Sequence, residues 1–208
     1  ELFQKVLGER FVIDHCLMLN RAPDSGGRKW HGHPYRDGSS EVEDPIGTEA
    51  SLTREFLQEQ CVRTLCYPEG ADDTDGGDFA VIPGAHLYRI PFKWSTKRPD
   101  HDEDMRAGWL RGKIHAFTGK PLEIVRLSIP PGSMVSFVHH MPHHVGRRMP
   151  EAPVRWGLLM ANRTPDCGAA PAQWSNGVPA HWAKRNAGRI SEDARRVLAG
   201  DNPIDPLQ

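Results

Sequence analysis

The sequence predicts a mainly β protein, a sandwich or barrel of short strands with helices at its ends. Its apolar residues fall in short runs, some alternating with polar residues at the two-residue period of half-buried strands. The 18 prolines and 20 glycines punctuate these runs, as expected for strands joined by many turns rather than for a parallel sheet covered by helices. No internal repeat at the roughly 20 to 50 residue period of solenoids is visible.

Six runs are the expected strands. In chain order they cover residues 11–19, 59–67, 79–82, 122–129, 134–138 and 154–161. Residues 2–8 are typical of the end of a helix that stops at a glycine, and residues 190–198 are typical of a helix that Ser191 caps. Residues 39–48 are acidic and predict a loop or lid, whereas the charged residues 97–107 predict a surface loop or a short helix.

Length and charge limit the possible functions. The 208 residues suit one domain, residues 1–208, and the formal net charge of -1 provides no field that would attract nucleic acid. No stretch of about 18 apolar residues predicts a membrane span, and the first ten residues lack the profile of a signal peptide. The four scattered cysteines form neither a zinc-ribbon pattern nor a disulfide framework. We therefore expect a cytoplasmic protein with no nucleic-acid or membrane partner.

The 11 histidines are the most informative residues of the chain. His31 and His33 lie two positions apart, so in an extended segment both side chains point to one face and can bind one metal ion. A third ligand is then expected from a distal cluster, His139, His140, His143 and His144. Iron(II) oxygenases hold their metal with two histidines and a carboxylate in such a three-point arrangement. The alternative for each group is a solvated polar surface.

Arg155 is the second candidate, because it places a charge in the otherwise apolar run 154–161. Such a charge must face solvent or meet a partner. The guanidinium fork suits bidentate binding of a carboxylate, such as the far end of 2-oxoglutarate, although an internal salt bridge is the alternative. Four other arginines are expected to form a solvated basic rim: Arg126, Arg147, Arg148 and Arg163.

The order of several motifs resembles the phytanoyl-CoA dioxygenase family of non-heme iron oxygenases. The motifs are Asn-Arg-Ala-Pro-Asp-Ser-Gly at 20–26, Trp-His-Gly-His at 30–33, a run at 76–86 ending in Pro-Gly-Ala-His, and Pro-Gly-Ser-Met-Val-Ser-Phe at 131–137. The resemblance implies a cupin-like jelly roll, or double-stranded β-helix, with flanking helices. It also implies iron(II), 2-oxoglutarate and hydroxylation of a small molecule. Family members usually extend further at the amino end, so we expect this chain to lack part of an N-terminal region.

The resemblance also implies roles for individual residues. His31 falls on the first metal histidine of the family's His-x-Asp motif, His33 falls on the aspartate, and Arg155 falls on the arginine that holds the cosubstrate. For the distal metal histidine, the spacing from Phe137 selects His143 and the spacing from Arg155 selects His144. Loops accept insertions more readily than strands, which favours His143 with His144 as the alternative.

Two departures from the family pattern bear on the chemistry. Histidine at position 33 in place of aspartate makes the site three neutral imidazoles, one positive charge more than usual, and Asp37 is the nearest candidate for a substitute carboxylate. The serine expected two positions after the distal histidine is Val145 or Gly146. Three hypotheses follow: a 2-oxoglutarate-dependent iron dioxygenase or hydroxylase, a three-histidine iron oxygenase that works without 2-oxoglutarate, and a non-catalytic metal-binding jelly-roll protein.

Overall fold

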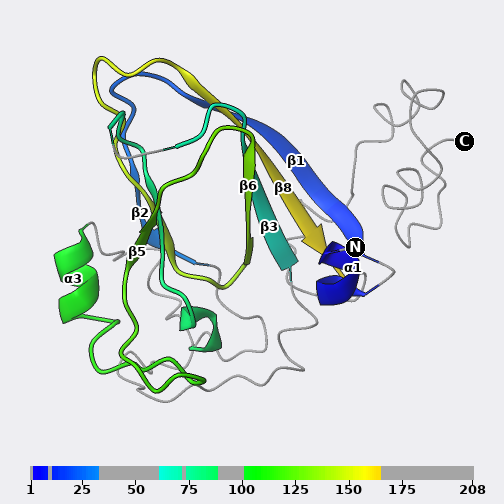
Figure 1. Ribbon diagram of the computed structural model, residues 1–208, viewed down its shortest axis with the longest axis vertical. Helices are drawn as coiled ribbons and strands as arrows, with labels where there is room; N and C mark the ends of the chain where they lie inside the picture. Colours follow the sequence, from blue (N-terminus) through cyan, green and yellow to red (C-terminus); the bar gives the residue numbers. More distant parts are fainter. Residues whose placement is uncertain (1, 9–10, 33–60, 72–73, 89–100, 165–208) are drawn as a thin grey trace, which may run out of the picture.

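The fold is a jelly roll made of two antiparallel four-stranded sheets that face each other (Figure 1). The computed structural model describes residues 2–8, 11–32, 61–71, 74–88 and 101–164. Its elements are α1 (Leu2–Leu7), β1 (Val12–Arg21), β2 (Arg28–His31), β3 (Cys61–Tyr67), β4 (Phe79–Val81), the 3₁₀ turn η2 (Ala85–Leu87), α3 (Asp102–Ala107), β5 (Val125–Leu127), β6 (Ser133–Val138), β7 (His143–Val145) and β8 (Arg155–Arg163).

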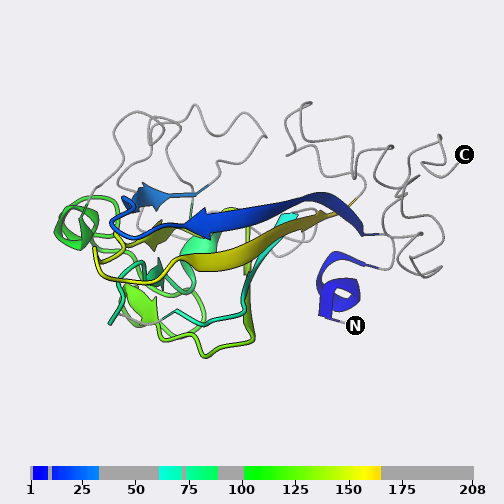
Figure 2. The same ribbon diagram turned by 90° about the horizontal axis from the view of Figure 1, so that it is seen from above.

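The strands pair in a nested order. β1 pairs with β8, β2 with β7, β3 with β6 and β4 with β5, so the first half of the chain folds back along the second half. Further pairing of β3 with β8 and of β4 with β7 completes the sheets β1-β8-β3-β6 and β2-β7-β4-β5. β1 and β8 run side by side as the longest pair (Figure 2). The predicted mainly β jelly roll is confirmed.

All six expected strands are present, but two further strands were missed. β2 and β7 are short and rich in histidine and basic residues, so they lack the apolar pattern that identifies a strand. β5 is shorter than the expected run 122–129, because the backbone N–H of Leu122 bonds instead to the carbonyl of Lys113. The helix expected at 190–198 and the loop at 39–48 lie outside the described residues. No helix in the described part is long and apolar enough to cross a membrane.

The sheet β2-β7-β4-β5 carries a core on each of its two faces, because successive side chains of a strand point to opposite sides. The inner core, between the sheets, consists of Tyr67, Ala71, Phe79, Val81, Ile129 and Phe137. The outer core includes Trp30, Ala80, Tyr88, Met105 and Trp109, and α3 covers this face (Figure 1). The alternative of a short helix within 97–107 is confirmed by α3, most of which is exposed, although Met105 is completely buried against the sheet.

Candidate metal centre

Two of the predicted metal histidines face each other across neighbouring strands. His31 of β2 and His143 of β7 are direct partners in the antiparallel ladder, and their ring centroids lie 4.0 Å apart. The register shifts between Arg28 and His31, and a bulge of this kind re-aims the side chain that follows it. Imidazole nitrogens bind a metal ion at about 2.1 Å, so two rings this close can reach one ion.

Backbone carbonyls select the same tautomer for both histidines. Nδ1 of His31 lies 2.7 Å from the carbonyl oxygen of Lys29, and Nδ1 of His143 lies 2.8 Å from that of Met141. Because a carbonyl oxygen only accepts, each Nδ1 donates its hydrogen and each Nε2 keeps the lone pair. Histidines that bind metals typically donate their second N–H in this way, which fixes the ring and raises its basicity.

Aromatic side chains surround His143. The ring centroids of Phe137 and Phe79 lie 4.8 Å and 5.7 Å from that of His143, whose side chain is buried. These two phenylalanines form an apolar wall beside the imidazole. The chemistry of these two donors and their surroundings fits a first-row metal ion.

His144 lies on the opposite face of the sheet. Its Cα pairs with that of Ala80, which belongs to the outer core, and its ring stacks on Trp30 with centroids 5.4 Å apart. Burial lowers the pKa of His144, an effect that the charge of Asp102 partly offsets. Of the two alternatives for the distal ligand, His143 is the one that lies beside His31.

His33 and Asp37 lie outside the described residues. Within the ranges that the structure describes, no group of three histidine, cysteine, aspartate or glutamate side chains is close enough to hold a metal ion, so the third ligand stays a prediction. His139 and His140 are buried, with their rings 6.1 Å apart. The alternative of a solvated polar surface is therefore wrong for these two residues.

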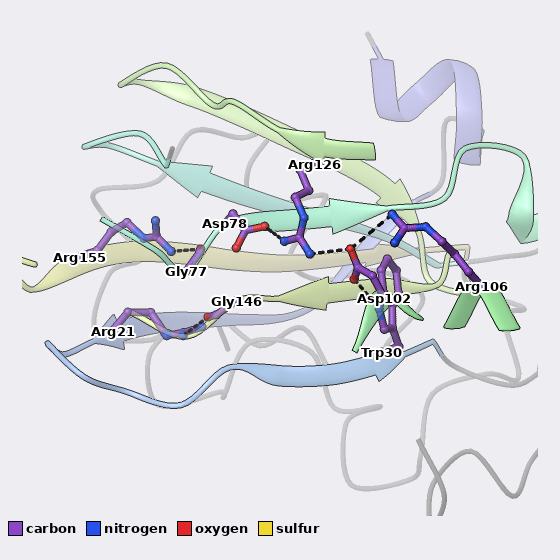
Figure 3. Close-up of polar contacts among 9 residues, drawn as sticks. All are labelled: Arg21, Trp30, Gly77, Asp78, Asp102, Arg106, Arg126, Gly146 and Arg155. Carbon is purple, nitrogen blue, oxygen red and sulfur yellow. Dashed lines mark hydrogen bonds and ion pairs between the residues drawn. The ribbon is translucent and has the colours of Figure 1, made fainter. Parts of the chain in front are cut away.

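A partly exposed ion-pair network links Arg126 with two carboxylates and reaches Trp30 (Figure 3). Arg126 of β5 bonds to both Asp78 and Asp102, at 2.6 Å for the latter. Asp102 also accepts a hydrogen bond from the indole N–H of Trp30 at 3.1 Å. Because Trp30 immediately precedes His31, this network fixes the strand that carries the histidine. Sequence reasoning missed the network, since its members lie far apart along the chain.

Arg21 ties together the two strands that carry His31 and His143. Its Nη2 donates to the carbonyl oxygen of Gly26 at 3.1 Å. It also donates to the carbonyl oxygen of Gly146 at 3.0 Å (Figure 3). Gly26 lies just before β2, and Gly146 lies just after β7. The guanidinium therefore holds the start of one histidine strand against the end of the other.

Arg155 enters the barrel at the start of β8 and is buried. It donates to the carbonyl oxygen of Gly77 (Figure 3), and its guanidinium carbon lies 5.9 Å from the ring centroid of Tyr67. Burial raises the pKa of Tyr67 to about 12, so this hydroxyl is neutral and does not balance the arginine charge. Burial, followed by the nearby charge of Arg148, lowers the pKa of Arg155. Among the described residues, no carboxylate forms an ion pair with Arg155.

The histidine pair and Arg155 lie at different heights in the same barrel. Gly77 contacts Arg155, and Val81 is the strand partner of His143. Gly77 lies four residues before Val81. At about 3.3 Å per residue the two levels are roughly 13 Å apart. Phe79 and Val145 are strand partners between these levels, so apolar side chains lie between the histidines and the buried arginine.

Comparisons with solved structures support the same fold. A structure of EctD from S. alaskensis with bound Fe aligns at a TM-score of 0.52 and 14% identity, covering 80% of this chain and 50% of that chain. EctD with 2-oxoglutarate and 5-hydroxyectoine aligns at 0.51 and 14%, covering 80% and 49%. The non-heme alpha ketoglutarate dependent epimerase SnoN from nogalamycin biosynthesis aligns at 0.50 and 11%, covering 79% and 53%.

These identities are low, so the likeness shows the jelly-roll fold and not the role of any residue. The chain spans about half the length of these structures. No family model and no curated protein sequence matches the chain. Membership of the phytanoyl-CoA dioxygenase family therefore stays a prediction from the motifs.

Proposed function

We propose that the chain is a non-heme iron-dependent dioxygenase or hydroxylase of the phytanoyl-CoA dioxygenase kind. It uses 2-oxoglutarate and acts on a small organic molecule. The observation that carries the proposal is the His31–His143 pair, in which both Nδ1 atoms donate to carbonyls and both Nε2 atoms keep their lone pairs. His33 is the third ligand in this proposal, and His144, on the outer face, is excluded from the set.

Arg155 supports the cosubstrate part of the proposal. A buried guanidinium without an ion-paired carboxylate in the described part of the chain suits the far carboxylate of 2-oxoglutarate, which it can bind through two parallel N–H bonds. Bound iron(II) and 2-oxoglutarate would together supply dioxygen activation, a reaction that yields succinate and carbon dioxide. The protein's own residues would orient the cosubstrate through Arg155, and the packed rings of Phe79 and Phe137 would exclude water beside the histidines. Solved EctD structures that share the fold are described with bound Fe and with 2-oxoglutarate.

Metal content is the first test of this function. Protein purified without a histidine tag is expected to bind iron(II) in a one-to-one ratio, and His31→Ala and His143→Ala are each expected to lose it. His144→Gln is the matched control, because this histidine is the sequence neighbour of His143 but lies on the other face. Retention of the metal in both alanine variants, with loss in the control, would contradict the ligand assignment.

The second test concerns the cosubstrate. Iron-loaded protein is expected to bind 2-oxoglutarate and to release succinate slowly even without substrate, and Arg155→Met is expected to weaken this binding. The favoured alternative, based on His33 in place of aspartate, is a three-histidine iron oxygenase that consumes oxygen without 2-oxoglutarate. Oxygen uptake measured with and without 2-oxoglutarate separates the two. A protein that binds metal but consumes no oxygen in either assay would favour the non-catalytic hypothesis.

A further inference from the structure

A second arginine lies beside Arg155, and it is more deeply buried. The side chain of Arg148 is only 1% exposed, which corrects the expectation that it belongs to a solvated basic rim. It donates to the carbonyl oxygens of Gly76 at 3.1 Å and Pro153 at 2.5 Å. Its Nε is buried and has no hydrogen-bond partner among the described residues. A buried donor in this state is uncommon and is typically met by a water, an ion or a bound ligand.

Gly77 brings the two arginines together. A Cβ atom at this glycine would lie 2.6 Å from Cδ of Arg148 and 2.8 Å from Nη2 of Arg155, so both side chains pack directly on its Cα. Two buried like charges this close repel each other and favour a shared anion. The nearest compensation is weak: Asp75 is 3.9 Å from Arg148 and its side chain is 48% exposed.

Both arginines line the same cavity of about 340 Å³, within the range typical of small-molecule sites. The cavity also contains two acidic side chains, Glu69 and Asp75, but Glu69 is exposed and accepts a hydrogen bond from the backbone of Trp156. Solvent screens such exposed acids far more than it screens the buried arginines. The cavity therefore has a positive floor and an acidic rim.

We propose that Arg148 and Arg155 together bind one carboxylate of a small dicarboxylate in this cavity. Under the proposed function, on which this identification of the ligand rests, that group is the far carboxylate of 2-oxoglutarate. Arg148 then supplies the polar contact that a serine after the distal histidine would otherwise provide, a position that is Val145 in this chain. The orphan Nε–H of Arg148 becomes one of the donors to the carboxylate.

Metal-free protein provides a test that does not depend on the iron site. We expect glutarate, a dicarboxylate that lacks the keto group, to bind and to shift the ¹⁵N–¹H signal of Arg148 Nε. Arg148→Met is expected to weaken glutarate binding about tenfold to a hundredfold, as for lost hydrogen bonds to a charged group. Arg148→Lys is the second variant, because it keeps the charge and is less disruptive, and it is expected to lose a smaller part of the affinity. Arg147→Met is the control, since this neighbour is 68% exposed and pairs with Asp24.

A matched pair of ligands separates carboxylate recognition from a general structural effect. The comparison uses 2-oxoglutarate and 2-oxopentanoate, which lacks the far carboxylate. In iron-loaded protein without oxygen, both Arg148 variants are expected to have a lower affinity for 2-oxoglutarate and an unchanged affinity for 2-oxopentanoate. Equal losses for the two acids would overturn the proposal, and so would wild-type protein that binds no glutarate at millimolar concentration. Glutarate binding without any metal binding would retain this inference and sink the proposed function instead.

Discussion

Replacing Gly77 by alanine would test whether the close packing of Arg148 and Arg155 is a strict structural requirement. Gly77 has a φ of +70°, and Gly119 has nearly the same value, +69°. Alanine in this left-handed region costs about 1–2 kcal/mol at either position. Only at Gly77 would the new methyl group collide with neighbours, whereas nothing lies within 4 Å of the Cβ position at Gly119. Gly119→Ala is therefore a control with the same backbone strain.

The difference between the two variants measures the arginine contacts. At Gly77 the methyl must displace Nη2 of Arg155 from the Gly77 carbonyl, a hydrogen bond from a charged group, which contributes about 1.5–3 kcal/mol. We expect Gly77→Ala to destabilise the protein by about 3–5 kcal/mol and Gly119→Ala by about 1–2 kcal/mol. Urea unfolding followed by circular dichroism gives both values. Equal destabilisation would refute the reasoning, because it would mean that the arginines move aside at no cost.

Three more outcomes follow from the site. Arg21→Met should lower the free energy of unfolding by about 1–2 kcal/mol and weaken metal binding, since the tie between the histidine strands is lost; unchanged metal affinity by calorimetry would contradict this tie. Arg126→Met should cost about 1–2 kcal/mol in urea unfolding, because the nearly buried carboxylate of Asp102 then keeps only the more distant Arg106, at 3.8 Å, and solvent already screens the half-exposed Arg126; a loss below about 0.5 kcal/mol would count against the network. Burial, with a smaller contribution from His115, lowers the pKa of His86. The unfolded chain therefore binds a proton more readily, so stability should fall as pH falls below about 6.5; His86→Gln should reduce this slope in thermal unfolding, and an unchanged slope would argue against it.

Alternation and turn residues were sufficient to predict a mainly β sandwich or barrel and its most apolar strands, because they carry that information locally. The jelly roll itself was implied by the resemblance of the motifs to a known family. It was insufficient for β2 and β7, whose residues are held in strands by pairing with distant segments rather than by their own preference. His31 followed from its motif. The alternation of His143 and His144 across one sheet depends on register with β4, which no local pattern shows.

Burial of arginines was the least predictable feature. Arg148 and its neighbour Arg147 are chemically identical, yet Arg148 is 1% exposed and the Arg147 side chain is 68% exposed. The difference arises because the carbonyl oxygens of Gly76 and Pro153 accept from the guanidinium of Arg148, whereas the guanidinium of Arg147 pairs with the exposed Asp24. Such acceptors come from backbone geometry that exists only after the sheets have formed.

The nested pairing of the strands also determines when the metal centre can form. β4 and β5 are the innermost pair and β1 and β8 the outermost, so each further pair closes a longer loop of chain. His31 and His143 are 112 positions apart in the sequence, and at roughly 5–20 residues per second a ribosome needs about 6–22 s to deliver the second histidine after the first. Until then the early segment has no partner strand for β2, and high contact order of this kind slows folding afterwards. The His31–His143 pair is therefore among the last features of the molecule to be completed, so under the proposed function metal uptake follows synthesis of most of the barrel rather than guiding it.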